Sequence, residues 1–248
     1  MNRTKIEWSD YTINPVKGLC PMHCKTPNGY EYCYAAGERG LYKRFKWDPE
    51  IRLDVDSFLP LLTTIRIKPS RIFIGSTFEL FGDWVKPEWL KFIFERVQML
   101  PEHTFIFLTK RPENLIKWSP FPKNCWVGCS ATNSEQAIRA MTELDFIEAN
   151  VKFLSLEPLM NNDGYTKWEY IYYKKINWLI IGQQTPIKQA TMPKIEWITS
   201  IVEAASKVGI PIFLKNNLES LIHREGQDNV YAKLLRTPSG KLRQEFPS

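Results

Sequence analysis

Histidine and cysteine are scarce in this sequence of 248 residues, which has three histidines and five cysteines. None of the histidines, His23, His103 and His223, lies where a buried strand is expected to end, which weakens the hypothesis of a catalytic cysteine–histidine pair. An odd number of cysteines, three of them close together, is a poor disulfide framework for a chain of this length. In a reducing compartment, clustered thiols more often bind metal or carry out redox chemistry.

Long apolar runs are also missing. No stretch approaches the roughly 20 apolar residues that a membrane-spanning helix needs. The N-terminal segment MNRTKIEWSDYT is polar and lacks the apolar core of a signal peptide. We therefore expect a cytoplasmic protein. Apolar residues make up 44% of the chain, which is enough for a chain of this length to bury a sizeable core.

The sequence contains no low-complexity segment and no obvious linker, so we expect a single domain over residues 1–248. The formal net charge is +6. This charge mildly favours an anionic partner, and nucleic acid is the obvious candidate, although lysine and arginine form no long run.

Short runs rich in β-branched and aromatic residues alternate with helix-like segments along the chain. Such runs are typical of strands in a buried parallel sheet, and they lie at 11–18, 71–77, 104–110, 125–130, 151–157, 178–184 and 211–217. Helical spacing or helix-capping residues occur at 33–45, 54–66, 86–100, 133–149 and 194–209. The alternation predicts an α/β fold and favours a (β/α) barrel that need not be complete; a doubly wound open sheet is the main competitor.

Polar side chains follow most of these expected strands. In a (β/α) barrel they would gather on the rim formed by the C-terminal ends of the strands, where barrel enzymes carry out their chemistry. The set comprises Ser76, Thr77 and Glu79; Lys110 and Arg111; Ser130 and Asn133; Ser155 and Glu157; Gln183 and Gln184; and Lys215 and Asn216.

Three cysteines, Cys20, Cys24 and Cys33, follow the first expected strand. A structural zinc site usually takes four ligands in paired short spacings, but no second pair is visible and His23 lies directly beside Cys24. An iron–sulfur cluster held by three thiolates, with the fourth iron left open, is the other metal centre that fits. Cys125 is most simply a core residue, whereas Cys129 at the end of its strand is a candidate hydrogen-atom donor.

Three cysteines in a loop after the first strand of a partial barrel resemble the radical S-adenosylmethionine (SAM) enzymes. Their usual motif is Cys-x3-Cys-x2-Cys with an aromatic residue before the third cysteine. Here the spacing of Cys20 and Cys24 matches, and Tyr32 precedes Cys33, but the second gap is eight residues long. The resemblance implies a partial (β/α) barrel of the radical SAM type, with parallel strands and outer helices.

A closer resemblance covers nearly the whole chain and concerns a phage-associated family of radical SAM-like proteins. It rests on the serial order of TKIEWSDYTINPVKG, CYA, IFIGSTFELF, HTFIFLTKRPENL, CWVGCSATN, VKFLSLEPL, WLIIGQQT and PIFLKN. The superfamily resemblance implies a 4Fe-4S cluster on the three cysteines, SAM as cofactor, a 5′-deoxyadenosyl radical, and an external electron donor of the flavodoxin or ferredoxin type. A nucleic acid base or nucleotide is the expected substrate.

The resemblance also implies roles for the rim residues. Ser76, Thr77 and Glu79 would meet the methionine ammonium group, Ser130 and Asn133 the ribose, and Gln183 the adenine edge. Lys110 or Arg111 would pair with a carboxylate or a substrate phosphate, Glu157 would bind cofactor or substrate, and Tyr32 would lie at the cofactor. Two alternatives remain open: a zinc-stabilised nucleic-acid-binding protein without catalysis, and a cluster protein that senses redox state.

Overall fold

The computed structural model describes residues 1–26, 29–37, 40–63, 67–161, 168, 176–224 and 230–247. The chain divides into two compact units. The first unit comprises Met1–Asn114 with Phe121–Trp126, and the second comprises Leu115–Pro120 with Val127–Ser248. The single domain expected over the whole chain stays a prediction, and each unit is described by itself.

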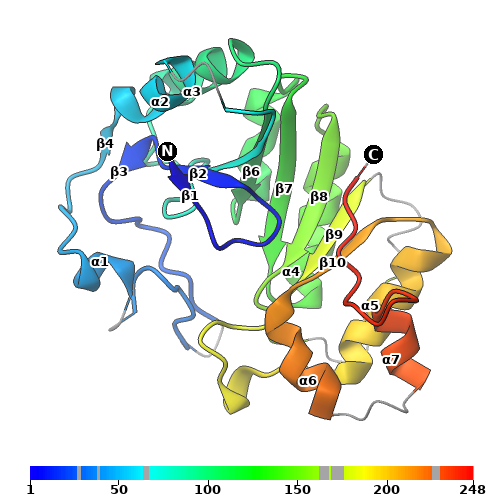
Figure 1. Ribbon diagram of the computed structural model, residues 1–248. Coiled ribbons are helices and arrows are strands. Elements are labelled where there is room, and N and C mark those ends of the chain that lie inside the picture. Colours follow the sequence, from blue (N-terminus) through cyan, green and yellow to red (C-terminus); the bar gives the residue numbers. More distant parts are fainter. Residues whose placement is uncertain are drawn as a thin grey trace. The chain divides into compact units, whose positions relative to one another are not determined.

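The first unit is built on parallel strands (Figure 1). Its strand order is β1 (Asn2–Arg3), β2 (Tyr11–Ile13), β5 (Arg71–Ile74) and β6 (Thr104–Thr109). Only β1 runs antiparallel to its neighbour; β2 and β5 pair from Tyr11 with Ile72 onward, and β5 and β6 from Arg71 with Thr104 onward. Because the strands are buried, their apolar residues run almost without interruption, as the sequence pattern predicted.

The helices of the first unit follow from local signals. Helix α3 (Pro87–Gln98) begins with proline, whose fixed φ suits the first helical position, and it buries Leu90, Ile93 and Val97 at intervals of three and four residues. The remaining elements are β3 (Val16–Lys17), α1 (Leu41–Arg44), β4 (Arg52–Leu53), η1 (Val55–Phe58), α2 (Leu59–Thr63) and η2 (Pro112–Trp118), the last of which continues into the second unit. Strands β3 and β4 pair antiparallel.

The second unit also has a parallel arrangement. Its strand order is β7 (Cys125–Ala131), β8 (Val151–Leu156), β9 (Trp178–Ile181) and β10 (Ile212–Leu214); β7 begins in the first unit. Strand β9 pairs in parallel with β8 and with β10, and its four residues are all buried. The helical elements are α4 (Ser134–Asp145), η4 (Gln189–Thr191), α5 (Ile195–Lys207), η5 (Asn216–Leu218), α6 (Glu219–Arg224) and α7 (Val230–Leu235).

Most expected elements are confirmed, with ends shifted by a few residues, but one is wrong. The helix predicted over 33–45 is reduced to the four residues of α1, and residues 34–36 form a turn. Gly40 explains part of the difference, because a Cβ there would lie 2.4 Å from the carbonyl oxygen of Ala35. The helix predicted over 54–66 is η1 and α2, and residues 64–66 lie outside the described part.

Within the described residues, no helix is both long enough and apolar enough to cross a membrane.

Candidate functional site

The cysteine loop lies in the first unit and contains a small hairpin between its second and third cysteines. Thr26 and Tyr30 are joined by backbone and side-chain hydrogen bonds, and Lys25 pairs with Glu31 in an antiparallel bridge. The amide of Tyr32 donates to the carbonyl of Cys24 at 3.1 Å. Although eight residues separate Cys24 from Cys33 in the sequence, the hairpin therefore brings its two ends, and these two cysteines, close together.

The hairpin places the thiols of Cys24 and Cys33 in hydrogen-bonding contact. This hydrogen bond holds the pKa of the Cys33 thiol well below its usual value, and it raises the pKa of Cys24, to which burial also contributes. Backbone amides of Ala35 and Ala36 also bond to Cys33. Burial raises the pKa of Cys20, whose sulfur accepts a hydrogen bond from the amide of Glu79 at 3.4 Å.

A lysine from the end of β6 lies among the acidic groups of this loop. Burial by itself lowers the pKa of Lys110, but the nearby negative groups Cys24, Tyr32 and Glu79 outweigh it, so that the pKa is raised overall. The same cation opposes the effect of burial, which raises the pKa of the Tyr32 phenol. Lys110 and Tyr32 therefore lie at the thiols, and their roles in cofactor binding stay predictions.

Glu79 is buried, and its carboxylate joins the ends of two strands. It accepts hydrogen bonds from the Thr109 hydroxyl at 2.6 Å, from the Lys110 amide at 2.8 Å and from the Phe81 amide at 3.0 Å. Burial raises its pKa in spite of these bonds. Glu79 thus positions the end of β6, a role that the sequence did not reveal. Its predicted contact with the methionine ammonium group stays a prediction.

The turn after β5 brings Ser76 and Thr77 to the same loop through residues that the sequence analysis missed. The side chain of Asn14 accepts from the Ser76 hydroxyl at 3.2 Å and from the Thr77 amide at 3.1 Å. The Tyr42 hydroxyl donates to the carbonyl of Thr77 at 2.7 Å and accepts from the amide of Cys20 at 3.3 Å. Asn14 follows a strand, as the predicted rim residues do, so its position was a usable signal; Tyr42 offered none.

Tyr34 gives a further link between the cysteine loop and the turn after β5, since its hydroxyl donates to the carbonyl of Ser76.

Arg111, unlike its neighbour Lys110, does not lie at the thiols but forms ion pairs elsewhere in the first unit. Its guanidinium pairs with Asp83 at 2.7 Å and with Glu113 at 2.8 Å, which is the arrangement of a structural ion pair.

The predicted rim residues of the second unit form their own hydrogen-bond network. Glu157 forms an ion pair with Lys215, and its carbonyl accepts from the Ser130 hydroxyl at 3.2 Å. Gln183 is buried and exchanges hydrogen bonds with Asn217, while its Oε1 atom has no partner within the described residues. Ser130 lies on β7, whereas Glu157 follows β8, Gln183 follows β9, and Lys215 and Asn217 follow β10.

Two other predicted residues of the second unit have structural positions. Asn133 is the N-cap of α4, and its side chain accepts from the amide of Gln136 at 2.9 Å. Cys129 is completely buried in β7, and its role as a hydrogen-atom donor stays a prediction. Cys125 is a core residue of the first unit, as expected, and burial raises its pKa.

The donor set at the cysteine loop fits an iron–sulfur cluster in its chemistry. Thiolates ligate such clusters, and hydrogen bonds to the sulfur atoms tune them. Three thiols of one loop, backbone amides directed at two of them and a lysine beside them provide these features. Thr77 adds a buried hydroxyl that has no partner within the described residues. Among all the residues that the structure describes, no group of three or more Cys, His, Asp or Glu side chains has the geometry of a metal site.

The fold assigns the protein to a structural class. A solved structure of a spore photoproduct lyase mutant superimposes with a TM-score of 0.57 at 13% identity, covering 86% of this chain and 78% of that one. A double mutant of spore photoproduct lyase with bound AdoMet and dinucleoside spore photoproduct has a TM-score of 0.52 at 16% identity, covering 83% of this chain and 63% of that one. This shared fold confirms the predicted fold class, an α/β partial (β/α) barrel with parallel strands and outer helices.

Residues 3–233 match the family described as Protein of unknown function (DUF5131), and the chain belongs to this family. A sequence search of curated proteins finds no match. The phage association stays a prediction.

Proposed function

We propose that the protein is a radical SAM enzyme that acts on a nucleic acid base or nucleotide, with a 4Fe-4S cluster on Cys20, Cys24 and Cys33. The observation that carries the proposal is the hairpin that brings Cys33 back to Cys24, because it removes the objection raised by the long gap between them. The fold shared with a SAM-binding lyase supports the same reading.

When bound, the cluster would supply the electron that cleaves SAM to methionine and a 5′-deoxyadenosyl radical, which abstracts a hydrogen atom from the substrate. The chain's own residues hold the reactants. The three thiolates act as ligands, and the amides of Glu79, Ala35 and Ala36 stabilise negative charge on two of the sulfur atoms. Lys110 is the cation available to a carboxylate at this place.

Ser76, Thr77 and Glu79 are proposed to bind the methionine ammonium group. The Thr77 hydroxyl is the strongest candidate, because it is buried and has no other partner in the described chain. In the second unit, Ser130 and Asn133 are proposed for the ribose, Gln183 for the adenine edge, Glu157 for cofactor or substrate and Cys129 for hydrogen-atom donation. Gln183 brings an unpaired buried acceptor, which an exocyclic amino group would satisfy.

The proposed substrate class rests on charge and on the structural neighbours. The chain carries a net charge of +6, which favours a polyanion. A spore photoproduct lyase structure is complexed with dinucleoside spore photoproduct. We further propose a cytoplasmic location and reduction by an external flavodoxin or ferredoxin.

Anaerobic purification, reconstitution and reduction test the proposal. A brown protein that converts SAM to 5′-deoxyadenosine and methionine, as measured by chromatography, is the expected result. A colourless protein with bound zinc would support the zinc-stabilised alternative. A brown, fully loaded and reduced protein that makes no 5′-deoxyadenosine would leave the redox-sensor alternative standing.

A further inference from the structure

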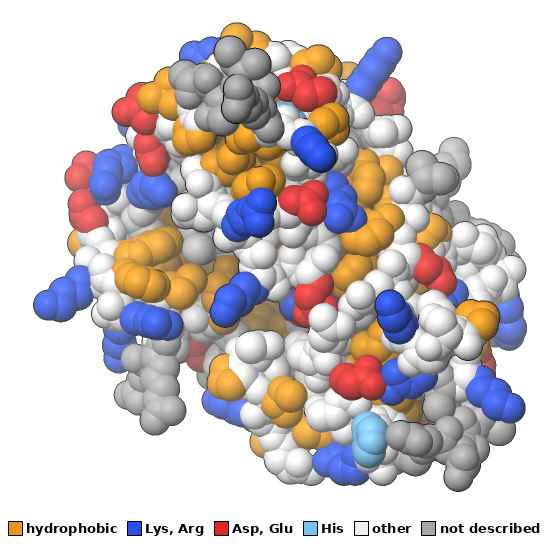
Figure 2. Space-filling model, in the orientation of Figure 1, with side chains coloured by type: hydrophobic (Ala, Val, Ile, Leu, Met, Phe, Trp, Pro, Cys, Tyr) orange, Lys and Arg blue, Asp and Glu red, His pale blue; other side chains and the backbone are white. Residues whose placement is uncertain are grey.

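A short basic and aromatic segment next to the cysteine loop presents its side chains to solvent. Lys43 and Arg44 form the last turn of α1 and are exposed, and Phe45 is 60% exposed although it is a large apolar residue. Lys46 follows with a φ of 47°, a left-handed conformation that non-glycine residues rarely adopt. In Figure 2, hydrophobic side chains in the region of α1 are bordered by lysine and arginine. We call Lys43, Arg44, Phe45 and Lys46 the α1 platform.

The cations of the α1 platform have no acidic partner among the described residues. No ion pair is formed by Lys43, Arg44 or Lys46 with any residue that the structure describes. The guanidinium of Arg44 lies 5.4 Å from the centre of the Phe45 ring, a cation–π arrangement that holds both groups at the surface. An exposed ring beside cations that form no ion pair with the described residues combines the two features that proteins use to bind single-stranded nucleic acid: a stacking surface for a base and charges for phosphates.

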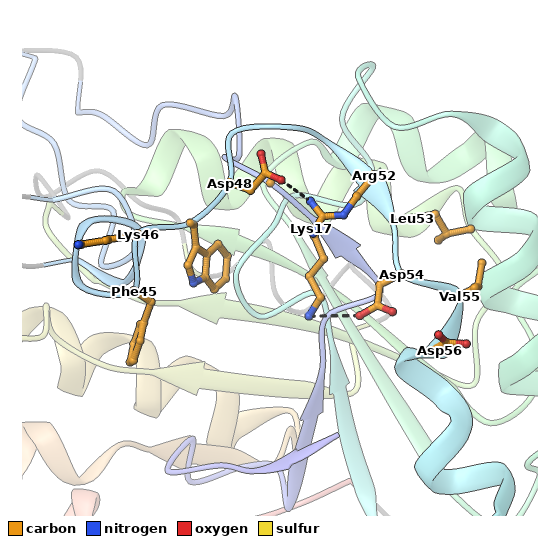
Figure 3. Close-up of a pocket in the computed structure, with 11 residues that line it drawn as sticks. Lys17, Phe45, Lys46, Asp48, Arg52, Leu53, Asp54, Val55 and Asp56 are labelled. Carbon is orange, nitrogen blue, oxygen red and sulfur yellow. Dashed lines mark hydrogen bonds and ion pairs between the residues drawn. The ribbon is translucent and has the colours of Figure 1, made fainter.

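A pocket of about 630 Å³ adjoins the platform (Figure 3). Phe45 and Lys46 lie at one end of it in this view, and Asp56 lies at the other. Two of the other acidic groups are neutralised internally, because Asp48 pairs with Arg52 at 3.0 Å and Asp54 pairs with Lys17 at 3.5 Å. A phosphate chain is therefore favoured at the Phe45 end and repelled at the Asp56 end.

The platform is joined directly to the proposed catalytic loop. The ring of Tyr42 contacts that of Trp47, with centroids 5.0 Å apart, while its hydroxyl bonds to the backbones of Cys20 and Thr77. Gly18, which lines the pocket, lies two residues before Cys20. A nucleic-acid strand held on the α1 platform would therefore lie beside the cysteine loop, within the first unit.

We infer that the α1 platform is a binding site for single-stranded nucleic acid, in which an unpaired base stacks on Phe45 and the flanking phosphates contact Lys43, Arg44 and Lys46. A duplex fits less well, because the faces of paired bases are covered by their neighbours. The inference rests on the proposed function for its link to chemistry, since it names the polymer that carries the substrate. Single-stranded DNA and RNA share the stacking and phosphate chemistry, so both are used as probes.

The test measures the fluorescence anisotropy of labelled oligothymidylate, oligouridylate and a duplex over a range of salt concentrations. The full chain should bind at least one single strand more tightly than the duplex. Phe45→Ala should weaken this binding by about five- to a hundredfold with little change in salt dependence, because a stacking contact and no charge is lost. Lys43→Ala should instead reduce the slope of log affinity against log salt by about 0.7.

Matched variants control for general effects. Phe146 is 66% exposed in the second unit, and Lys207 is exposed on α5, so Phe146→Ala and Lys207→Ala should bind like the wild type. Phe45→Trp should keep its affinity, since a larger ring stacks at least as well. Absence of binding at low salt, equal binding of the duplex, or equal effects of Phe45→Ala and Phe146→Ala would each overturn the inference.

Binding is measured without reductant or SAM, so its outcome is separate from that of the proposed chemistry. A protein that binds single strands through Phe45 but makes no 5′-deoxyadenosine would support the α1 platform and overturn the proposed enzymatic function. A protein that makes 5′-deoxyadenosine but does not bind single strands through Phe45 would overturn only the α1 platform.

Discussion

The amide of Tyr32 donates a hydrogen bond to the carbonyl of Cys24, at 3.1 Å, and thereby closes the gap before Cys33. An insertion of several residues between metal ligands costs little free energy when it folds back on itself, because the entropic cost of closing a loop grows only slowly with its length. The insertion seen in the sequence is thus a hairpin on the cysteine loop that leaves Cys24 and Cys33 together.

The turn of this hairpin provides a first prediction. Gly29 has a φ of +82° and open space around its Cα, so Gly29→Ala adds only the strain of a left-handed alanine, about 1–2 kcal/mol. We expect reconstituted Gly29→Ala to hold less iron per chain than the wild type. Gly209→Ala is the matched control, since Gly209 has a φ of +71° and equally open surroundings in the second unit. Full iron content in Gly29→Ala would show that the hairpin turn does not set the ligand spacing.

The cluster ligands provide a second prediction. Cys20→Ala, Cys24→Ala and Cys33→Ala should each lose iron and visible absorbance but keep most of the fold, because these cysteines are only half-buried in a loop. Cys125→Ala removes a thiol from the core and should keep its iron. Iron and sulfide assays with circular dichroism make the comparison. A loop cysteine whose loss leaves iron and sulfide complete is not a ligand.

Glu79 provides a third prediction, which separates its two roles. Removing its carboxylate leaves the Thr109 hydroxyl and the Lys110 and Phe81 amides without their acceptor, so Glu79→Ala should lower the free energy of unfolding by about 1.5–3 kcal/mol. Glu88→Ala, at an exposed position in the first turn of α3, is the control in urea unfolding. If Glu79 also contacts SAM, the reconstituted variant should keep its iron and bind SAM about ten- to a hundredfold more weakly in equilibrium dialysis. Unchanged SAM binding would leave it a positioning residue only.

A fourth prediction concerns pH and the C-terminal segment. Burial alone would raise the pKa of Glu245, but hydrogen bonds from Arg243 and from the Ile212 amide lower it overall. A carboxyl group whose pKa is lower in the folded state stabilises the fold above its unfolded pKa, and this stability is lost as the pH falls through the folded pKa.

Glu245→Gln should therefore reduce the loss of stability between about pH 5 and pH 3 in urea unfolding. The effect should be modest, because the side chain is 40% exposed and solvent screens its ion pair with Arg243. Glu203→Gln, at an exposed position of α5, should follow the wild type. Identical pH profiles for wild type and Glu245→Gln would contradict the lowered pKa of Glu245 in the folded state.

The sequence by itself determined the elements and their type. Apolar runs predicted the strands, a stripe at intervals of three and four predicted α3, and Asn133 marked the start of α4, because these signals depend on residues close together in the chain. The sequence also pointed to three clustered thiols, because recognising such a cluster requires only the spacing of the cysteines along the chain. Where glycines and a compact turn replaced the helix expected over 33–45, helical spacing was misleading.

Only the tertiary structure decided how the site is assembled. Glu79 meets Thr109 and Lys110 some 30 positions later, and Asn14 meets Ser76 and Thr77 some 60 positions later. These partners are chosen by which strands lie side by side and in what register, which no local pattern encodes. For the same reason the structure paired Arg111 with Asp83 and Glu113, placed Lys110 at the thiols, and left Phe45 exposed beside cations that form no ion pair with the described residues.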